Sequence, residues 1–406
     1  MSQAGAIYTR LTAGAPLPAA LIGFVAAFAL CVALCWLIAR FCWRWGVLDH
    51  PGPRRIHSAP APRLGGLAVF GAFVTVSFAL YRPANTYERH VYAGLLIASI
   101  LVVGVMAYDD VRGLPPLPRL CAQCAAALIV MFPAGHGALI EVLHNPLTAS
   151  HHGRTFLGIW LAVPFTLFWI VGMMNTINWV DGVDGLAGGL VTIAALVMAV
   201  ISWLLGQHTI ALLCAILAGA VLGFLVLNWH PARLFMGDCG AMFLGLALAV
   251  LSNVGGAKLA TMLLLLALPI LDAARVVVRR VREGHSPLRA DRSHLHHRLL
   301  AGGFSQRQVA LLFYAVTATF GGVTILATAL QANGDLARLV VGLRRIPLAG
   351  FALPGVGGAG LLLAGGYGVW QAIAAWKAHR ASRAMDETTD LLATVSAPAS
   401  ARHPVG

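Results

Sequence analysis

Residues 209–228 read TIALLCAILAGAVLGFLVLN and contain no charged side chain. A helix of about 20 apolar residues crosses the hydrocarbon core of a bilayer. This stretch therefore predicts a transmembrane helix. The rest of the chain agrees, because its 406 residues are 59% hydrophobic and only 11% charged, whereas soluble domains contain about 25% charged residues.

Similar apolar stretches recur along the chain. They predict an all-α polytopic membrane protein with about 10–11 transmembrane helices. The predicted spans are 19–41, 64–81, 90–108, 120–134, 157–174, 186–205, 209–228, 239–254, 258–278, 308–330 and 349–376. We expect residues 1–376 to form one membrane-embedded domain. The segment 377–406, rich in Ala, Ser and Thr with mixed charge, is expected to be a disordered cytoplasmic tail.

The basic residues predict the orientation. The formal net charge is +13, but the Lys and Arg residues lie in short loops between apolar spans, and no nucleic-acid-binding motif accompanies them. Most of them lie in the loops after the first, third, fifth, seventh and ninth predicted spans and in the C-terminal tail. Cytoplasmic loops are enriched in Lys and Arg. We therefore expect the N-terminus outside and the C-terminus in the cytoplasm.

Cys121 and Cys124 have the spacing of a redox or zinc pair. They lie in an apolar stretch without a second pair. We interpret them as small buried hydrophobic residues.

Two adjacent carboxylates, Asp109 and Asp110, stand at the cytoplasmic end of the third predicted span. Neighbouring side chains on a helix point about 100° apart, so both can border one site. The two carboxylates repel each other, and a divalent cation relieves that repulsion. A solvated helix end would show the same pair, so the pair alone is a weak signal.

Four polar side chains recur every three residues from Asn175 through Asn178 and Asp181 to Asp184. This spacing places them along one stripe of a helix or 3₁₀ turn. A packing contact between helices needs one or two such side chains. Four, with two carboxylates among them, favour a ligand or metal site.

The loop between the seventh and eighth spans runs from Asn228 to Gly240. Pro231 ends the first helix, and a Gly-Asp-x-Gly turn opens the next. Asp238 could cap that next helix or bind a metal ion. Phe235 could stack on a base or anchor the chain at the membrane interface.

The loop after the ninth span carries three histidines with several arginines: His294, His296 and His297. This composition suits anionic phosphate oxygens better than a His₃ zinc site, because His296 points away from the other two on a helix. Ser305 and Gln308 then have the spacing of a capping box that starts the next helix.

The segment 49–66 is a basic loop rich in Pro and Gly before the second span. It carries Arg55 and His57. The segment can be an anchor on the cytoplasmic side or a clamp for phosphate, and the segment alone does not separate the two.

In this order, the five segments resemble the polyprenyl-phosphate N-acetylhexosamine-1-phosphate transferase family, glycosyltransferase family 4. The resemblance covers roughly residues 20–330. The matching elements are Arg63–Gly66, Asp109–Asp110, Asn175–Leu186, Phe235–Gly240 and His294–Arg298. Two positions depart from the pattern, since Ala241 replaces the usual Ser and Arg119 stands where Lys is common.

The resemblance implies transfer of N-acetylhexosamine 1-phosphate from a UDP-sugar to undecaprenyl phosphate, with release of UMP. The His-x-His-His-Arg form is similar to the branch that uses UDP-GlcNAc and starts lipopolysaccharide O-antigen or other cell-wall glycans. Mg²⁺ is the implied cofactor, with Mn²⁺ as a possible substitute. The implied partners are UDP-N-acetylhexosamine, polyprenyl phosphate and the lipid bilayer of a bacterial inner membrane, with a homodimer possible and no nucleic acid.

The resemblance also implies that the cytoplasmic loops carry the catalytic residues, and it implies roles for individual residues. The implied metal ligands are Asp238, Asp109 and Asp110. The implied catalytic residues are Asp109, Asp110, Asp181, Asp184, Asp238, His296 and His297. The implied substrate-binding residues are Arg55, His57, Arg119, Asn175, Asn178, Asn228, Phe235, His294 and Arg298.

A membrane transporter or flippase of lipid-linked sugars is the alternative. Multiple spans with charged residues suit both classes of protein. A transporter is expected to place its charges near the bilayer midplane. The carboxylates of this chain cluster at one predicted interface, which favours the enzyme.

Overall fold

The structure, a computed structural model, describes residues 16–49, 60–132, 137–144, 154–254, 258–285 and 293–332. The chain divides into two units, Met1–Arg345 and Ile346–Gly406, and all described residues belong to the first. The predicted span 349–376 and the predicted tail 377–406 lie outside the described residues.

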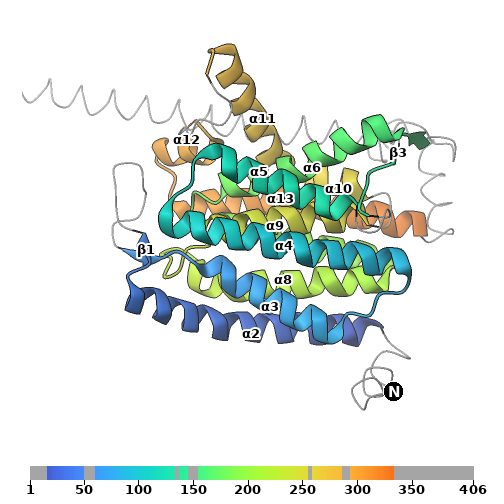
Figure 1. Cartoon of the computed structure of the whole chain (residues 1–406), viewed down its shortest axis with the longest axis horizontal. Coiled ribbons are helices and arrows are strands. Elements are labelled where there is room, and N and C mark those ends of the chain that lie inside the picture. Colours follow the sequence, from blue (N-terminus) through green and yellow to red (C-terminus); the bar gives the residue numbers. More distant parts are fainter. Residues whose placement is uncertain are drawn as a thin grey trace, which may run out of the picture. The chain divides into compact units, whose positions relative to one another are not determined.

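The described residues form helices and two short antiparallel ribbons (Figure 1). The elements are α2 (Pro16–Trp45), β1 (Leu48–Asp49), β2 (Ala61–Pro62), α3 (Gly65–Leu80), α4 (Thr86–Arg112), α5 (Pro116–Met131), β3 (Val142–His144), β4 (Arg154–Phe156), α6 (Ile159–Val180), α7 (Leu186–Leu204), α8 (His208–Asn228), α9 (Gly237–Asn253), α10 (Lys258–Leu265), α11 (Ala267–Arg282), α12 (Leu295–Ala301) and α13 (Gln306–Ala332).

Six described helices are long and apolar enough to cross a membrane: α2, α4, α6, α7, α8 and α13. A seventh span results if α10 and α11, which are bent by 74° relative to each other, form one broken span. The predicted number is reached only when the shorter apolar helices α3, α5 and α9 are counted too. The predicted all-α polytopic fold is confirmed, but the ninth predicted span is two helices and not one.

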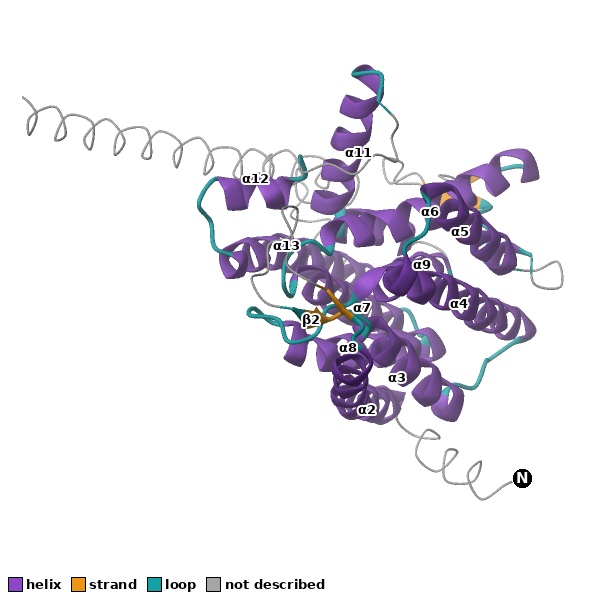
Figure 2. Cartoon of the chain, turned by 60° about the vertical axis from the view of Figure 1, so that its left-hand side comes forward, coloured by secondary structure: helices purple, strands orange, loops and turns teal. Residues whose placement is uncertain are grey.

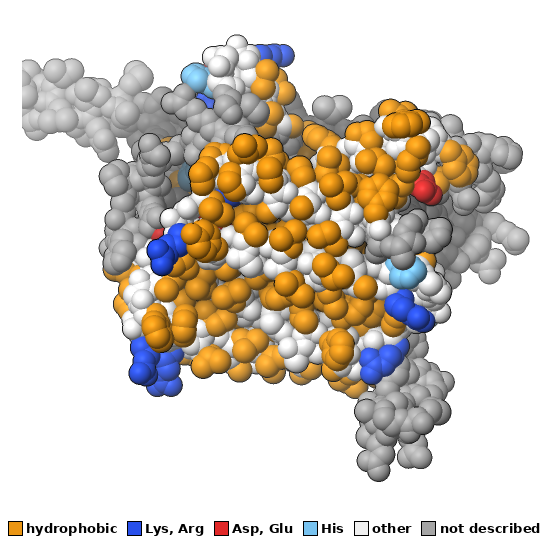
Figure 3. Space-filling view, viewed as in Figure 1, with side chains coloured by type: hydrophobic (Ala, Val, Ile, Leu, Met, Phe, Trp, Pro, Cys, Tyr) orange, Lys and Arg blue, Asp and Glu red, His pale blue; other side chains and the backbone are white. Residues whose placement is uncertain are grey.

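Helices α8 and α9 form the buried centre of this bundle. Helix α8 packs against α2 and α7, and α9 packs against α4 and α6. The outer helix α2 instead exposes large apolar side chains, among them Leu21, Trp36 and Leu37. Figure 3 shows apolar side chains over the middle of the helices, with Lys and Arg gathered at the two ends. An outer surface of this kind suits a lipid environment.

One end of the bundle carries the loops that contain the predicted site residues. Helices α2, α4, α6 and α8 end there, and α3, α5, α7, α9 and α13 begin there. We call it the site end. The ribbon β1–β2 lies at the site end, with Asp49 opposite Ala61, and the ribbon β3–β4 belongs to the opposite end (Figures 1 and 2).

Helices α3 and α9 begin side by side at the site end. The N–H of Gly65 donates to the carbonyl of Phe235 (2.9 Å), and the N–H of Gly66 donates to the carbonyl of Met236 (2.8 Å). A Cβ atom on Gly66 would lie 2.2 Å from the Cα of Gly240. Only glycine permits this approach of the two backbones.

The predicted capping box at the start of α13 is confirmed. The N–H of Gln308 donates to the hydroxyl of Ser305 (3.3 Å), and the N–H of Ser305 donates to the side chain of Gln308 (2.8 Å). Two N–H groups at the helix start are thereby satisfied.

Candidate functional site

Asp110, at the end of α4, caps the first turn of α9. Its Oδ1 accepts the N–H of Asp238 (2.9 Å), and its Oδ2 accepts the N–H of Cys239 (3.0 Å). The Nε of Arg63 lies 3.1 Å from the same Oδ1, and the Asp110 side chain is 0% exposed. A carboxylate in this place accepts hydrogen bonds from N–H groups that have no partner within the helix. The positive end of the helix dipole stabilises its negative charge. Both oxygens of Asp110 therefore fix the backbone that carries Asp238.

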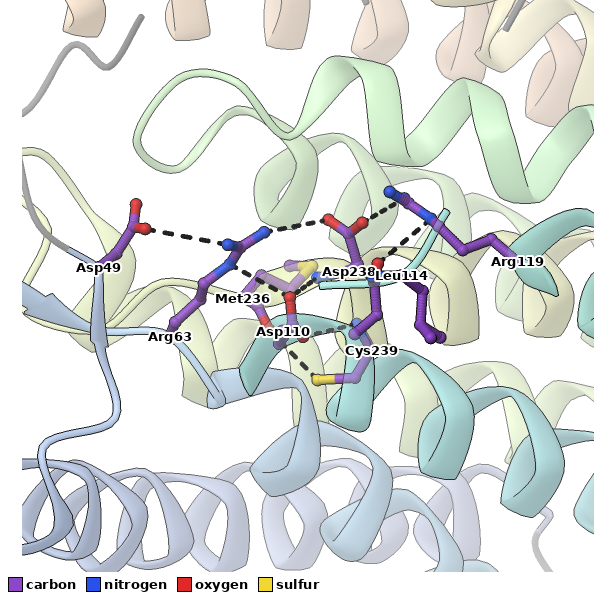
Figure 4. A network of polar contacts seen from close by, with 9 residues as sticks. Asp49, Arg63, Asp110, Leu114, Arg119, Met236, Asp238 and Cys239 are labelled. Carbon is purple, nitrogen blue, oxygen red and sulfur yellow. Dashed lines mark hydrogen bonds and ion pairs between the residues drawn. The ribbon is translucent and has the colours of Figure 1, made fainter. Parts of the chain in front are cut away.

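Asp238 lies between two guanidinium groups (Figure 4). The Nη2 of Arg63 is 3.5 Å from its Oδ1, and the Nη2 of Arg119 donates to its Oδ2. The Nη1 of Arg63 also lies 3.8 Å from Oδ1 of Asp49. With Asp109 and Asp110, four carboxylates share these two arginines. Among the described residues, this network therefore contains more carboxylates than guanidinium groups.

Asp109 holds the turn that follows α4. Its Oδ1 accepts the N–H of Leu114 at 2.5 Å, and its Oδ2 lies 3.2 Å from Nε of Arg119. The carboxylate thus orients Arg119 toward Asp238. Arg119, predicted from its position in the family pattern, belongs to the site through this contact.

The carboxylate of Asp184 joins the turn after α6 to the loop before α9. The Oδ2 of Asp184 accepts the N–H of Ala232 (3.1 Å) and lies 2.7 Å from Nδ1 of His230. Gln306, the first residue of α13, accepts the N–H of Asp184 (3.1 Å). The start of α13 is thereby attached to the site.

Asn228 connects the same two segments from inside. Its side-chain oxygen accepts the N–H of Gly185 (3.0 Å), and its side-chain nitrogen donates to the carbonyl of Leu234 (3.0 Å). The side chain is buried. Its donor and acceptor groups both hold backbone in place.

A cavity of about 290 Å³ opens between these segments. Six of the predicted site residues line it: Asp181, Asp184, Asn228, Phe235, Asp238 and His297. Asp49, Arg63 and Gln306 also line it. The sequence therefore predicted residues from three separate loops that the fold brings to one cavity.

Asp181 ends α6 and lines the cavity. Desolvation, reinforced by the negative charges of Asp238 and Asp110, raises the pKa of the Asp181 carboxyl well above its usual range. The described lining of the cavity thus brings the Asp181 carboxyl close to other carboxylates. A bound cation would relieve this repulsion.

The histidine segment reaches the cavity from α12. His297 lines the cavity, and its ring centroid lies 4.3 Å from that of His296. His296 is 1% exposed, and its Nε2 has no hydrogen-bond partner among the described residues. Burial, and next the charges of His297 and His294, lower the pKa of His296 to about 3. Burial therefore favours the neutral form of the His296 ring over the cation.

Because Gly182 has no side chain, the ring of His296 can lie close to the turn that contains it. A Cβ atom on Gly182 would lie 2.8 Å from Nε2 of His296. The unpaired nitrogen thus faces a cavity-lining turn from which a side chain is absent.

Several predicted residues lie away from the cavity lining. The side-chain nitrogen of Asn175 donates to Oε1 of Gln123 on α5 (2.6 Å) and to the carbonyl of Val171 (2.8 Å). Asn178 is not among the residues that line the cavity. Arg298 is exposed on α12.

Arg55 and His57 lie outside the described residues. His294 is not among the residues that line the cavity, and its ring packs 5.7 Å from that of Trp179.

The donors around the cavity fit a hard divalent cation, because Mg²⁺ prefers carboxylate oxygens. Asp181, Asp184 and Asp238 supply them. Among the described residues, no three His, Cys, Asp or Glu side chains already converge as a metal-binding group, and both oxygens of Asp238 contact arginine. A cation at Asp238 would therefore compete with Arg63 and Arg119.

Comparison with known proteins agrees with the motifs. The family model described as "Glycosyl transferase family 4" matches residues 92–256. A "Probable undecaprenyl-phosphate N-acetylglucosaminyl 1-phosphate transferase" of Bacillus subtilis is 32% identical over 301 residues, which are 73% of this chain and 81% of that protein. This chain belongs to glycosyl transferase family 4.

Other family 4 relatives agree. A "Decaprenyl-phosphate N-acetylglucosaminephosphotransferase" of Mycolicibacterium smegmatis is 37% identical, over 74% of this chain and 80% of that protein. An "Undecaprenyl-phosphate alpha-N-acetylglucosaminyl 1-phosphate transferase" of Escherichia coli is 30% identical, over 70% of this chain and 77% of that protein. The family 4 match contains the carboxylates of α4, α6 and α9 described above. The predicted family is confirmed.

The family 4 pattern did not single out His230 or Gln306. His230 lies in the loop from Asn228 to Gly240, where its neighbour Pro231 gave a stronger local signal. Gln306 lies beside a capping box and carries no charge, so the sequence offered no chemical reason to select it.

Proposed function

We propose that this family 4 transferase moves N-acetylglucosamine 1-phosphate from UDP-GlcNAc to a polyprenyl phosphate and releases UMP. The names of the relatives support the acceptor and the sugar phosphate, since they specify undecaprenyl or decaprenyl phosphate and N-acetylglucosamine. The observation that carries the proposal is the carboxylate-lined cavity at one end of a membrane bundle. A soluble nucleotide and a phosphate at the bilayer surface can meet there.

The reaction needs no covalent enzyme intermediate. An oxygen of the lipid phosphate attacks the β-phosphorus of the UDP-sugar, and the bond from that phosphorus to the bridging oxygen breaks. The electron pair of that bond leaves with UMP, and the sugar phosphate remains on the lipid as a diphosphate. Positioning and charge stabilisation then account for catalysis.

Arginines at the site supply fixed positive charge. The guanidinium groups of Arg63 and Arg119 stand at Asp238 and present several N–H donors in a plane, which suits phosphate oxygens. When substrate phosphates enter the cavity, these donors can bind both phosphate and carboxylate. His297, which lines the cavity, adds a further hydrogen-bonding group.

We propose that Asp238, with Asp181 and Asp184, holds Mg²⁺ or, as a substitute, Mn²⁺. The ion would neutralise charge on the reacting phosphates. Because the oxygens of Asp109 and Asp110 already bind Arg119 and the backbone of α9, we propose positioning roles for these two residues. Phe235, on the cavity wall, is the proposed contact for the uracil ring.

We further propose that the site end faces the cytoplasm of a bacterial inner membrane. The excess of Lys and Arg in the corresponding loops supports this orientation. A transporter is the less favoured alternative, because the carboxylates gather at one end of the bundle. A homodimer stays a prediction.

UMP release tests the proposal. The full chain, purified in detergent, is mixed with UDP-GlcNAc, undecaprenyl phosphate and MgCl₂. We expect UMP only when both the lipid phosphate and the divalent ion are present, and no UMP after addition of EDTA until excess Mg²⁺ is restored. No release from any UDP-N-acetylhexosamine would overturn the proposed function.

A further inference from the structure

Asp272 of α11 is a buried carboxylate that the proposed chemistry does not use. The residue is 9% exposed. Its Oδ2 lies 2.9 Å from Nδ1 of His294 and accepts the N–H of Leu295 at 2.9 Å. Its Oδ1 accepts from Nη2 of Arg275 at 2.8 Å. An ionised carboxylate only accepts hydrogen bonds, so Nδ1 of His294 carries the proton in this contact.

Arg275 strengthens the same attachment. Its Nη2 also donates to the carbonyl of Ser293 at 2.5 Å. The backbone on both sides of His294, at Ser293 and Leu295, is thus hydrogen-bonded to side chains of α11. His294 is held by its ring and by its neighbours.

The helix that carries the other histidines depends on this attachment. Helix α12 has 7 residues, and an isolated helix of this length is unstable in water. His294 occupies its N-cap position without a side-chain cap of its own. The Asp272 carboxylate accepts the N–H of Leu295 in place of such a cap.

A series of ring contacts connects His294 with the cavity. The rings of His294 and His296 are nearly parallel, with an angle of 7° and centroids 5.7 Å apart. The ring of Trp179 supports His294 from α6 at 5.7 Å. His296 is in turn 4.3 Å from His297, which lines the cavity. A rotation of the His294 ring would therefore disturb both following histidines.

We propose that Asp272 is a positioning residue for the transfer reaction. It keeps His294 in the form with Nδ1 protonated, and through His294 it fixes His296 and His297 at the cavity. A carboxylate that orients a histidine in this way sets the ring orientation and the position of the proton. This inference rests on the proposed function for its effect on rate, but the proton position at His294 can be measured without any substrate.

A double-mutant cycle tests the effect on rate. The variants are Asp272→Asn, His294→Gln and the double variant, with Glu283→Gln as the control. Glu283 follows α11, and its side chain is 50% exposed. This control therefore also removes one carboxylate charge, but from a side chain that is much more exposed than that of Asp272. The measurement is kcat and KM for UMP release, and each variant is compared with the wild type.

We expect each single variant to lower kcat by about 10-fold to 100-fold, as loss of an orienting partner does at other sites. The kcat of the double variant should be at most about threefold below that of the slower single variant, because the two residues act as one unit. Glu283→Gln should match the wild type. Multiplying losses, or an Asp272→Asn variant as fast as the control, would overturn the proposal.

Nitrogen-15 spectra of histidine-labelled protein test the proton position. The difference between wild-type and His294→Gln spectra assigns the His294 ring. We expect a proton on Nδ1 in the wild type and a loss of this preference in Asp272→Asn. An Nδ1 without a proton in the wild type would overturn the proposal, whether or not the chain releases UMP. If the wild type releases no UMP but Nδ1 is protonated, the proposed function fails and the role of Asp272 in holding His294 stands.

Folding is checked by size-exclusion chromatography and thermal unfolding in detergent. If Asp272→Asn does not fold, Asp272→Glu replaces it, because this variant keeps the charge. If neither folds, the carboxylate belongs to the stability of the bundle and the proposal is wrong.

Discussion

Asp110 and Asp238 carry the same charge but have different surroundings. The Asp110 side chain is 0% exposed and accepts two backbone N–H groups, whereas the Asp238 side chain is 17% exposed and lines the cavity. The first carboxylate can support the site, and the second can touch a substrate or an ion. This difference decides what each substitution should do.

We predict that Asp238→Asn and Asp110→Asn each lower kcat at least 100-fold, but with different effects on stability. Asp238→Asn removes a charge from the reacting centre, and loss of such an electrostatic interaction costs about 100-fold to 1,000-fold. Asp110→Asn turns an amide N–H toward a backbone N–H. A buried donor left unpaired costs about 1–3 kcal/mol.

Thermal unfolding in detergent separates these two roles. The melting temperature of Asp110→Asn should fall, and that of Asp238→Asn should not. If both variants keep wild-type activity, the assignment of the site is wrong. If their melting temperatures fall equally, the proposed division of roles is wrong.

Gly182 provides a test of the histidine geometry. In Gly182→Ala the new methyl group would lie 2.8 Å from Nε2 of His296, so the histidine must move. We expect kcat to fall about 10-fold or more, since small displacements of positioning groups reduce rates strongly. The control is Gly172→Ala on α6, where a Cβ meets no atom within 4 Å. Equal activity of the two variants would contradict the placement of His296.

The sequence predicted the residues of the turns better than those within helices. Asp181, Asp184 and Asp238 lie at helix ends, and their motifs name them directly. Asn175 was grouped with them because of a three-residue spacing. At about 100° per residue, however, Asn175 and Asp181 lie about 120° apart around the helix. Asn175 therefore faces Gln123 of α5 and not the cavity, a result that only the packing of α5 shows.

The helix starts of α3 and α9 show a constraint at the level of elements. A Cβ on Gly66 would lie 2.2 Å from backbone atoms of Gly240, and backbone cannot rotate away as a side chain can. We predict that Gly66→Val lowers the melting temperature and abolishes UMP release. Gly104→Val on α4 is the control, because a Cβ there meets no atom within 4 Å. Similar melting temperatures for both variants would contradict the close contact of α3 and α9.

The sequence predicted one span where α10 and α11 form two helices, and the reason is physical. Mean hydropathy stays high across Leu266, so the two helices read as one span. Pro269 lies three residues after the break and has no N–H for the carbonyl of Leu265. This proline was the available signal. The break matters for function because it turns α11, and with it Asp272, toward the histidine segment.

At the scale of the whole bundle, aromatic side chains mark both ends. Trp43 and Trp45 are exposed on α2 at the site end, and Trp160 is exposed at the start of α6 at the opposite end. Tryptophan is enriched where a bilayer meets water. The site therefore lies close to one membrane boundary, where a lipid phosphate resides.

Cysteine labelling tests which side of the membrane that boundary faces. Cys121 is exposed, not buried as predicted, so the background carries Cys121→Ser. Arg112→Cys, at the exposed end of α4, reports on the site end, and Trp160→Cys reports on the opposite end. We predict that an impermeant maleimide labels Trp160→Cys in intact spheroplasts and labels Arg112→Cys only after lysis. The reverse pattern would contradict the proposed cytoplasmic site.

Transfer of the sugar together with its phosphate is the central claim, and one labelled donor tests it directly. UDP-GlcNAc carrying phosphorus-32 at the β-phosphate is incubated with the purified chain, undecaprenyl phosphate and Mg²⁺, and the lipid is extracted. The account predicts that the label enters the lipid fraction in step with UMP release. Label that stays in the aqueous phase, as unreacted donor or as labelled UDP, would contradict it.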